Sequence, residues 1–253
     1  MRYGRELLLH GEKRNAVLDL PEIQRFGIDS YGDAAYVSIY GLQPAQWYTR
    51  GIRLLGRTAV ECTRDALASA IGQDVAALVG DSPQAHVVDL FAGSGNTLYW
   101  LLRHLPGAHG LGFELDSGVF ELTRRNLAIM GLPIEVLNID YVAGLSRINA
   151  APGSLLVVFV APPWGKALDP VNGLDLRRTE PSVTAIVDQL QRAFAHCRLV
   201  CAIQTHESIQ PESLTELQAR FEWQTLRMYS LNAPGQNHGI VLSTIGWKPP
   251  SGR

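Results

Sequence analysis

The sequence has only three cysteines among its 253 residues, Cys62, Cys197 and Cys201. They are too few and too irregularly spaced for a disulfide framework or a zinc site, so we predict no bound metal and a reducing compartment. Excess positive charge is also missing, because 22 Lys and Arg stand against 24 Asp and Glu, a net charge of −2. Such a chain is not expected to bind long DNA, which proteins hold through many phosphate contacts, although a short basic patch is compatible with this balance.

A long apolar run is missing as well. The longest, around residues 155–164, is far shorter than the ~20 residues that span a membrane. The first residues, MRYGRELLLHGEKR, have only a short apolar stretch before charged side chains, so no secretory signal is expected. No internal repeat is found. These absences predict a soluble, cytoplasmic protein without a membrane partner, and they leave its oligomeric state open.

The strongest local pattern is VVDLFAGSGNT, residues 87–97. Two β-branched residues lead into Asp89, and Gly93 and Gly95 follow just before an apolar helical pattern begins. This order predicts a buried strand, a tight glycine turn and the start of a helix. Glycine lets the backbone approach a ligand closely, and the free amides of the first helical turn point toward the same place. We therefore expect a ligand with polar groups at this turn.

Strand-like and helix-like segments alternate after this turn. We expect helices at residues 97–104, 118–130 and 183–197, and strands at residues 109–113, 134–138, 155–160 and 199–204. A further helix is expected over residues 58–80, with Thr58 as its N-cap and Gly80 as its C-cap. Alternation of this kind implies right-handed crossovers and a mostly parallel sheet.

The two ends of the chain depart from the alternation. Residues 221–229 and 239–247 are strand-like, and the connection LNAPGQNH is too short for a crossover helix, so they are expected to form an antiparallel hairpin. Residues 1–57, with a short strand-like piece at 35–40, are interpreted as an N-terminal cap on a main domain at 58–250. The predicted fold is α/β, a doubly wound, Rossmann-like, seven-stranded sheet with the hairpin at its end.

The glycine turn also has family features. A dinucleotide fingerprint would place a third glycine where Leu98 stands, whereas this chain has an acidic residue, Asp89, four positions before Gly93. The run DLFAGSGNT resembles motif I of the class I S-adenosylmethionine-dependent methyltransferases. The resemblance implies S-adenosyl-L-methionine as cofactor, held in part by Asp89, Phe91, Gly93, Gly95, Asn96 and Thr97.

Carboxylates follow the next two predicted strands. Glu114 is well placed to accept hydrogen bonds from both ribose hydroxyls, and the resemblance assigns it this role, with Asp116 a weaker candidate. The alternative is an ordinary solvated acid at the start of a helix. Asp140 corresponds to a family position whose carboxylate accepts from the adenine amino group, although by itself its segment is only a strand followed by a turn.

The predicted strand at 155–160 runs directly into Ala161, Pro162, Pro163 and Trp164. Prolines remove backbone donors and fix φ, so this segment predicts a rigid turn at the carboxyl end of a strand, where α/β sheets bind ligands. Its carbonyls are free to accept from a substrate amine, and Trp164 offers a flat face for a ring. The alternative is a stiffened loop in which Trp164 only packs.

This turn resembles the PPW or PPY motif of amino-methyltransferases. Together with GNT after the glycine turn and GLDL at residues 173–176, it is similar to the trimethylguanosine synthase family, over roughly residues 87–179. Those enzymes methylate the exocyclic amine of a guanine cap, with the tryptophan stacked on the base. Many members carry Asp, Asn or Ser before the prolines, whereas this chain has Ala161, so backbone carbonyls would have to orient the amine.

The sequence thus predicts an N-methyltransferase of a planar nitrogen heterocycle, a purine (guanine-like) base, a nucleotide or a short RNA end. An enzyme of small-molecule natural-product biosynthesis and a non-catalytic cofactor-binding module stay open as alternatives. Weaker substrate-binding candidates are Trp47, Tyr48, Lys166 and His206. For each the alternative is structural: the two aromatic residues pack the cap, and Lys166 and His206 are ordinary surface residues.

Overall fold

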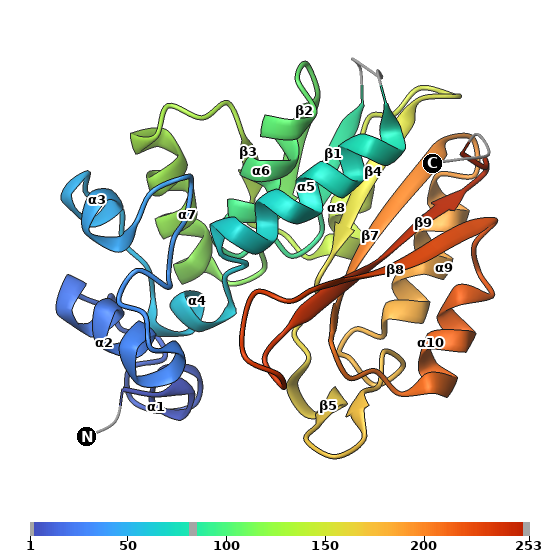
Figure 1. Cartoon of the computed structure of the whole chain (residues 1–253). Coiled ribbons are helices and arrows are strands. Elements are labelled where there is room, and N and C mark those ends of the chain that lie inside the picture. Colours follow the sequence, from blue (N-terminus) through green and yellow to red (C-terminus); the bar gives the residue numbers. More distant parts are fainter. Residues whose placement is uncertain (1–2, 81–84, 250–253) are drawn as a thin grey trace.

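A seven-stranded sheet forms the centre of the computed structural model, which describes residues 3–80 and 85–249 (Figure 1). Its strand order is β3-β2-β1-β4-β7-β9-β8. The strands span β1 (His86–Asp89), β2 (His109–Phe113), β3 (Glu135–Leu137), β4 (Leu155–Val160), β7 (Arg198–His206), β8 (Trp223–Tyr229) and β9 (His238–Ile245). β1, β2, β3, β4 and β7 run parallel, and β9 pairs antiparallel with both β7 and β8. The predicted doubly wound sheet with its C-terminal hairpin is confirmed.

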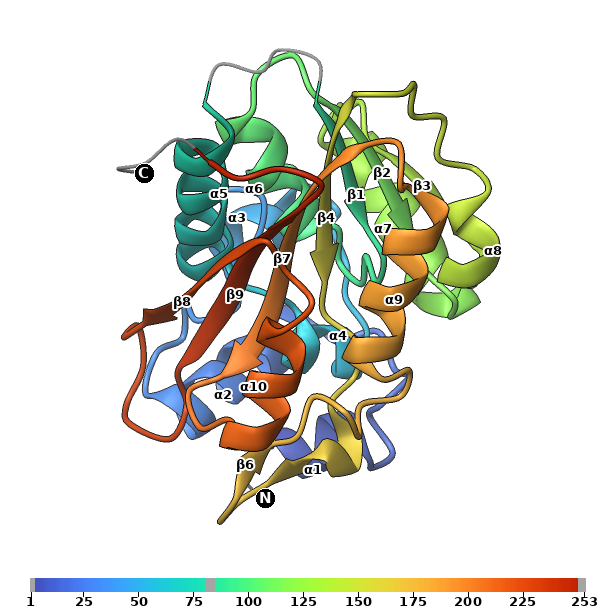
Figure 2. The same ribbon diagram turned by 90° about the vertical axis from the view of Figure 1, so that its right-hand side faces the viewer.

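Helices cover both faces of this sheet, because its central strands are apolar on both sides. One face, with Val88 and Val158, packs against α8 (Tyr141–Leu145), α9 (Val183–Ala193) and α10 (Pro211–Gln218). The other face, with Val87 and Val157, packs against α5 (Asp65–Val79) and α6 (Asn96–His104). Figure 2 shows α5 and α9 on opposite sides of the strands. α7 (Ser117–Ile129) connects β2 to β3.

The N-terminal cap is helical. It consists of α1 (Arg5–Leu9), α2 (Leu20–Tyr31), α3 (Pro44–Thr49) and α4 (Gly56–Glu61). Its hydrophobic cluster also includes Ala92, Leu127 and Val136 from the rest of the chain. The strand-like piece expected at 35–40 is wrong, because these residues form a loop. Tyr40 adopts a φ of 56° and donates its backbone N–H to the Asn96 side chain at 2.7 Å, so it does not pair with a strand. The cap lies at the end of the sheet where the parallel strands finish (Figures 1 and 2).

The helix expected over residues 58–80 is divided into α4 and α5. Cys62 is extended, with φ −63° and ψ 133°, and the Asn96 side chain donates to the Thr63 carbonyl at 2.8 Å. This carbonyl is therefore used outside any helix, which the apolar spacing did not reveal. Thr58 lies inside α4 and is not an N-cap, whereas Gly80 caps α5 with a φ of 64°, as predicted.

Most other bounds agree with the sequence to within a few residues, and β2 and β4 have the predicted bounds. Elements that were not predicted are the cap helices α1, α2 and α3, the helices α8 and α10, a 3-10 turn η1 (Gly165–Ala167) and a short hairpin of β5 (Leu168–Asp169) and β6 (Gly173–Leu174). The domain division stays a prediction; its boundary at residue 57 falls inside α4, and residue 250 lies outside the described residues. Within the described ranges, no helix is long and apolar enough to cross a membrane.

Candidate functional site

The register of the sheet brings three predicted motifs to one edge. Asp89, the last residue of β1, pairs with Gly112 on one side and with Phe159 on the other. All three strands are parallel, so the residues that follow them leave the sheet at the same edge. These residues are the glycine turn, the carboxylate of Glu114, and the segment that begins at Ala161.

The predicted strand, glycine turn and helix are present. Gly93 and Gly95 have φ values of 50° and 73°, in the left-handed region that favours glycine. The Thr123 hydroxyl donates to the Gly93 carbonyl at 2.6 Å, and a Cβ on Gly95 would lie 3.4 Å from the Thr123 methyl carbon. The turn is therefore held closely against α7.

Glu114 is fixed by backbone donors on both carboxylate oxygens. The N–H of Gly93 donates to Oε2 at 3.0 Å, and the N–H of Asp116 donates to Oε1 at 2.8 Å. Burial raises the pKa of Glu114, and these two hydrogen bonds oppose that effect. Asp116 also caps α7 and forms an ion pair with Arg57 of the cap at 2.6 Å. Each Glu114 oxygen retains a lone pair, so the carboxylate can accept two further donors.

Asp89 is a buried carboxylate that accepts few hydrogen bonds. It is 1% exposed, and the only hydrogen bond that it accepts from the described residues is from the N–H of Phe91, at 3.0 Å. Burial raises the pKa of Asp89 to about 7, and the negative charge of Glu114 adds to this. A buried carboxylate of this kind is stabilised by a cation or by further donors. The site therefore suits a ligand that brings a positive group to Asp89.

Asn96 links the turn to the cap. It is completely buried at the first position of α6; its Oδ1 accepts the N–H of Tyr40 at 2.7 Å and its Nδ2 donates to the Thr63 carbonyl at 2.8 Å. The Tyr40 hydroxyl also donates to the carbonyl of Ser94. Both polar atoms of Asn96 are thus engaged, so its observed contacts are structural.

The remaining cofactor candidates differ in exposure. Thr97 is 5% exposed at the start of α6. Phe91 follows β1, with its ring 5.4 Å from that of Tyr141. Asp140 is exposed and accepts the N–H of Val142 at 2.9 Å as the N-cap of α8. Of these three, only Asp140 presents a charged group to solvent.

The segment after β4 presents carbonyl oxygens that lack donors. No residue within 3–80 and 85–249 donates a hydrogen bond to the carbonyls of Ala161 or Pro162. The carbonyl of Trp164, in contrast, accepts the N–H of Ala167 at 2.8 Å. Ala161 and Trp164 are partly exposed and Pro162 is buried. Two acceptors are thus available next to a reachable indole ring.

Two histidines surround this indole. The ring centroid of Trp164 lies 5.9 Å from that of His206, edge to face, and 5.2 Å from that of His238. We call Trp164, His206 and His238 the aromatic cluster. His206 is the last residue of β7 and pairs with His238, the first residue of β9. Burial lowers the pKa of His238 to about 4, with the positive charges of nearby basic groups as the lesser cause, so its ring is neutral at physiological pH.

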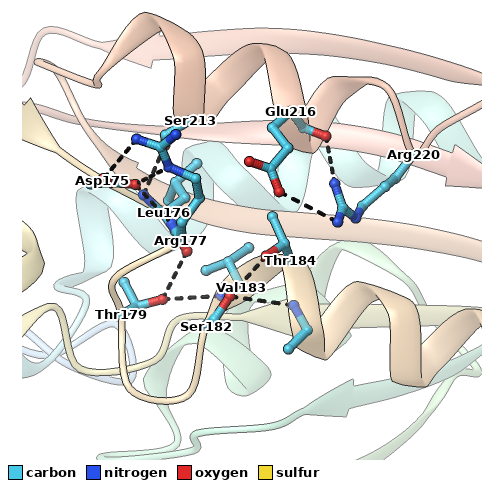
Figure 3. A network of polar contacts seen from close by, with 11 residues as sticks. Asp175, Leu176, Arg177, Thr179, Ser182, Val183, Thr184, Ser213, Glu216 and Arg220 are labelled. Carbon is cyan, nitrogen blue, oxygen red and sulfur yellow. Dashed lines mark hydrogen bonds and ion pairs between the residues drawn. The ribbon is translucent and has the colours of Figure 1, made fainter.

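A polar network anchors the segment that follows Trp164 in the chain, which includes the GLDL run at residues 173–176 (Figure 3). The N–H of Leu176 donates to the Ser213 hydroxyl of α10 at 2.8 Å. Asp175 accepts both arms of the Arg177 guanidinium, at 2.8 and 2.9 Å. The Thr179 hydroxyl donates to the Leu176 carbonyl at 3.1 Å (Figure 3). These contacts fix the far end of the segment that begins at Ala161.

The weaker substrate candidates separate into two groups. Trp47 is completely buried and donates its indole N–H to the Val37 carbonyl at 2.9 Å, so it packs the cap and is out of reach of a ligand. The Tyr48 ring lies 3.7 Å below the Arg53 guanidinium, a second contact within the cap. Lys166 is exposed in η1. His206 belongs to the aromatic cluster, and so does His238, which the sequence placed only at the end of a loop, residues 232–238, that could lie over the pocket.

No family model matches the chain, and no curated protein matches it in sequence. Solved structures do match. The methyltransferase domain of METTL16 (crystal form 2) superposes with a TM-score of 0.59 at 13% identity, over 91% of this chain and 82% of that one. The human methyltransferase 10 domain containing protein gives a TM-score of 0.53 at 15% identity, over 75% and 87%. The fold is that of the class I methyltransferases.

A third structure agrees with this assignment of the fold. It is a putative class I S-adenosylmethionine-dependent methyltransferase from Listeria monocytogenes, with a TM-score of 0.51 at 10% identity over 75% of this chain. This chain spans 63% of the Listeria protein. In open α/β sheets, which include the class I methyltransferase fold, ligands bind beyond the carboxyl ends of the strands. That edge holds Asp89, Glu114 and the aromatic cluster.

Proposed function

We propose that this protein is an S-adenosylmethionine-dependent N-methyltransferase that acts on a planar nitrogen heterocycle, with a purine base or nucleotide as the favoured acceptor. One observation carries the proposal. Asp89 ends β1, Glu114 follows β2, and Ala161 and Pro162, whose carbonyls accept no hydrogen bond from the described residues, follow β4. These strands are adjacent and parallel, so all four residues lie at one edge of the sheet. One half of the edge fits a cationic, hydroxyl-bearing cofactor, and the other half fits an amine on a flat ring.

The cofactor half matches three groups of S-adenosylmethionine. Asp89 lacks a cation, which the ammonium of the methionine part would supply. Glu114 has a lone pair free on each oxygen for the two ribose hydroxyls. Asp140 is exposed beyond β3 and can accept from the adenine amino group. The family resemblance points to the same three residues, Asp89 in motif I and Glu114 and Asp140 after the next two strands.

The acceptor half orients a primary amine. The carbonyls of Ala161 and Pro162 accept its two N–H groups, which turns the nitrogen lone pair out of the plane of those bonds. Trp164 holds the ring by stacking. When bound, S-adenosylmethionine supplies an electrophilic methyl group on a sulfonium. A bond forms between the nitrogen and the methyl carbon as the carbon–sulfur bond breaks, and the nitrogen then loses a proton to water, so alignment contributes most of the rate enhancement.

The small net charge of −2 favours a small acceptor over a long polyanion. A heterocycle of natural-product biosynthesis is therefore the second candidate. The structure offers both candidates the same carbonyls and the same indole. Only an acceptor screen separates them.

Transfer of a labelled methyl group tests the proposal. The full chain is incubated with methyl-labelled S-adenosylmethionine and, separately, with guanine and adenine nucleotides, a short capped RNA, free purines and a set of small heterocycles. We expect label on an exocyclic nitrogen of a purine, and no transfer by Asp89→Ala. Transfer to small heterocycles alone would establish the second candidate. Cofactor binding without transfer to any acceptor would instead identify a binding module.

A further inference from the structure

His238 lies between two strands of the sheet and beside Trp164. It opens β9 and pairs with His206 across the sheet and with Tyr229 on its other side, which places it at the carboxyl edge of the parallel strands. Its ring lies 5.2 Å from the ring of Trp164, inclined by 40°. A ring stacked on Trp164 would therefore have the His238 imidazole beside it.

The orientation of the Gln204 amide points to one tautomer of this imidazole. The Gln204 amide nitrogen lies 2.9 Å from His238 Nδ1, and its amide oxygen accepts the Thr63 hydroxyl at 3.1 Å. An amide nitrogen can only donate, so Nδ1 is the acceptor. A neutral imidazole with an acceptor at Nδ1 carries its proton on Nε2.

The support for Gln204 is continuous and mostly buried, with Thr63 partly exposed. Gln204 is 7% exposed, and the Thr63 carbonyl accepts from Asn96, which also receives the N–H of Tyr40. The chain of hydrogen bonds thus runs from the first residue of α6, next to the glycine turn, to His238. Buried networks whose members are all paired specify one arrangement of the side chains. Gln204 is therefore a positioning residue for His238.

The other nitrogen of His238 is free to bind. No residue in the described part of the chain forms a hydrogen bond with Nε2, and Nε2 is not among the buried atoms without a partner. The side chain is partly exposed. A donor that is reachable and unpaired, next to the indole that holds the ring, points to recognition of the ligand.

We propose that His238 is a substrate-binding residue whose neutral imidazole donates Nε2–H to a hydrogen-bond acceptor on the heterocycle that lies against Trp164. The inference rests on the proposed function and narrows its substrate class. The acceptor ring must carry a carbonyl oxygen or an unprotonated ring nitrogen on the side that faces His238. A ring that presents an N–H there is disfavoured, because two donors would meet. Nε2 holds the proton and has no basic lone pair, and the lone pair of Nδ1 is engaged by Gln204, so His238 does not act as a base.

Nitrogen NMR tests the tautomer without any turnover. The full chain, labelled with 15N-histidine, is studied at pH 7 with S-adenosylhomocysteine, and the His238 signals are identified by their loss in His238→Phe. We expect a neutral ring protonated on Nε2. A proton on Nδ1, or on both nitrogens, would overturn the inference whatever the enzyme methylates.

The same spectra then test ligand contact. Guanosine 5′-monophosphate is added, followed in separate samples by its analogues that lack O6, N7 or N3. We expect a shift of the Nε2–H signal with the parent nucleotide and no shift with one of the analogues. Absence of any shift over the whole panel would overturn the inference. A shift without methyl transfer would refute the proposed function alone.

Selectivity provides the functional readout. We expect the wild type to prefer the parent nucleotide over that same analogue by 10–100-fold in kcat/KM, as for a lost hydrogen bond to a site donor. His238→Phe should remove this preference by slowing the parent and leaving the analogue unchanged. Gln204→Met, which keeps the imidazole but releases its tautomer, should reduce the preference. His109→Phe, at the opposite edge of the sheet, is the matched control. An unchanged preference in both test variants would refute the role of His238.

Discussion

The carboxylate of Glu114 accepts the backbone N–H of Gly93 at 3.0 Å, so the residue after β2 holds the turn after β1. The second oxygen of Glu114 accepts from Asp116, which is itself paired with Arg57 of the cap. A single side chain thus joins the glycine turn, the start of α7 and, through Asp116, the cap. Changes at Glu114 should therefore affect both the shape of the site and the binding of a cofactor.

Glu114→Gln tests this double role. The amide oxygen can replace one acceptor, but the NH₂ group would face the remaining backbone donor. We expect affinity for S-adenosylhomocysteine, measured by isothermal titration calorimetry, to fall at least tenfold, with a melting temperature lower by a few degrees. Glu121→Gln on the exposed face of α7 is the matched control. Normal affinity in Glu114→Gln would remove Glu114 from the cofactor site.

Asp89 should oppose stability above neutral pH. Its pKa is raised from 3.8 to about 7 by burial, so between these values the folded protein keeps a proton that the unfolded chain has lost. The stabilisation that this proton gives the folded protein is complete below the pKa of Asp89 in the unfolded chain, 3.8. It is lost as the pH rises through about 7. We expect Asp89→Asn to melt higher than the wild type at pH 8 and close to it at pH 4. An equal difference at both pH values would contradict the raised pKa.

Cofactor binding should have the opposite pH dependence. Only the ionised form of Asp89 attracts an ammonium group, so affinity for S-adenosylhomocysteine should rise as the pH increases through about 7 and then level off. The rise approaches tenfold per pH unit, at most, below the pKa. Calorimetric titrations of the wild type and Asp89→Asn measure this rise in affinity. They run from pH ~5.5 to ~8.5, about 1.5 pH units on either side of the Asp89 pKa. Asp89→Asn should bind weakly with no such rise.

Trp164→Ala should separate the two halves of the site. The indole lies in the aromatic cluster, and within the described residues no hydrogen bond or ring contact joins it to Asp89 or Glu114, so cofactor affinity should be retained. Methyl transfer should fall on the order of 100-fold through loss of stacking and alignment, and Trp164→Phe should recover part of it. Asp89→Ala is the reciprocal variant, with cofactor binding abolished. Equal loss of cofactor binding in both variants would refute this division of roles.

Asn96→Ala should destabilise the protein by about 1–3 kcal/mol, since it leaves the buried N–H of Tyr40 and the carbonyl of Thr63 without partners. Urea denaturation of the apo protein measures this. Asn172→Ala, at an exposed position of the β5–β6 hairpin, should change stability by less than about 0.5 kcal/mol. Equal effects of the two substitutions would show that the contact between the cap and α6 is not important for stability.

The sequence predicts the central sheet well because the physical signals there are strong and local. The apolar run of β4 stops at Pro162, and the turn after β1 needs glycine at Gly93 and Gly95, whose φ values are positive. Short elements such as α8 and the β5–β6 hairpin have too few residues to show a period. The break between α4 and α5 was missed because its cause, the Asn96 side chain, comes from a distant part of the chain.

Part of the candidate site was predicted because its residues also belong to strong local sequence patterns. Asp89, Glu114 and Trp164 stand next to strand ends, so their place at one edge follows from a parallel sheet. His238 is different, since its position beside Trp164 depends on the antiparallel register of β9 against β7, and its tautomer depends on Gln204. Neither the register nor the hydrogen bond leaves a local sequence pattern. The sequence is equally uninformative about Trp47. An aromatic residue near arginines has the same local pattern whether it faces a ligand or packs inside the cap.

The network of Figure 3 separates two parts of the segment between β4 and α9. Pro162 fixes its beginning, and the pairing of Asp175 with Arg177 and the bond from Leu176 to Ser213 fix its end. Between them the hairpin tip is exposed to solvent, with Val171 88% exposed, and its side-chain hydrogen bonds, from Val171 and Asn172 to Asp169, stay within the hairpin. Residues can therefore be inserted or exchanged at this tip without displacing the indole. A library built there offers a way to engineer the choice of acceptor while the fold and the cofactor half stay intact.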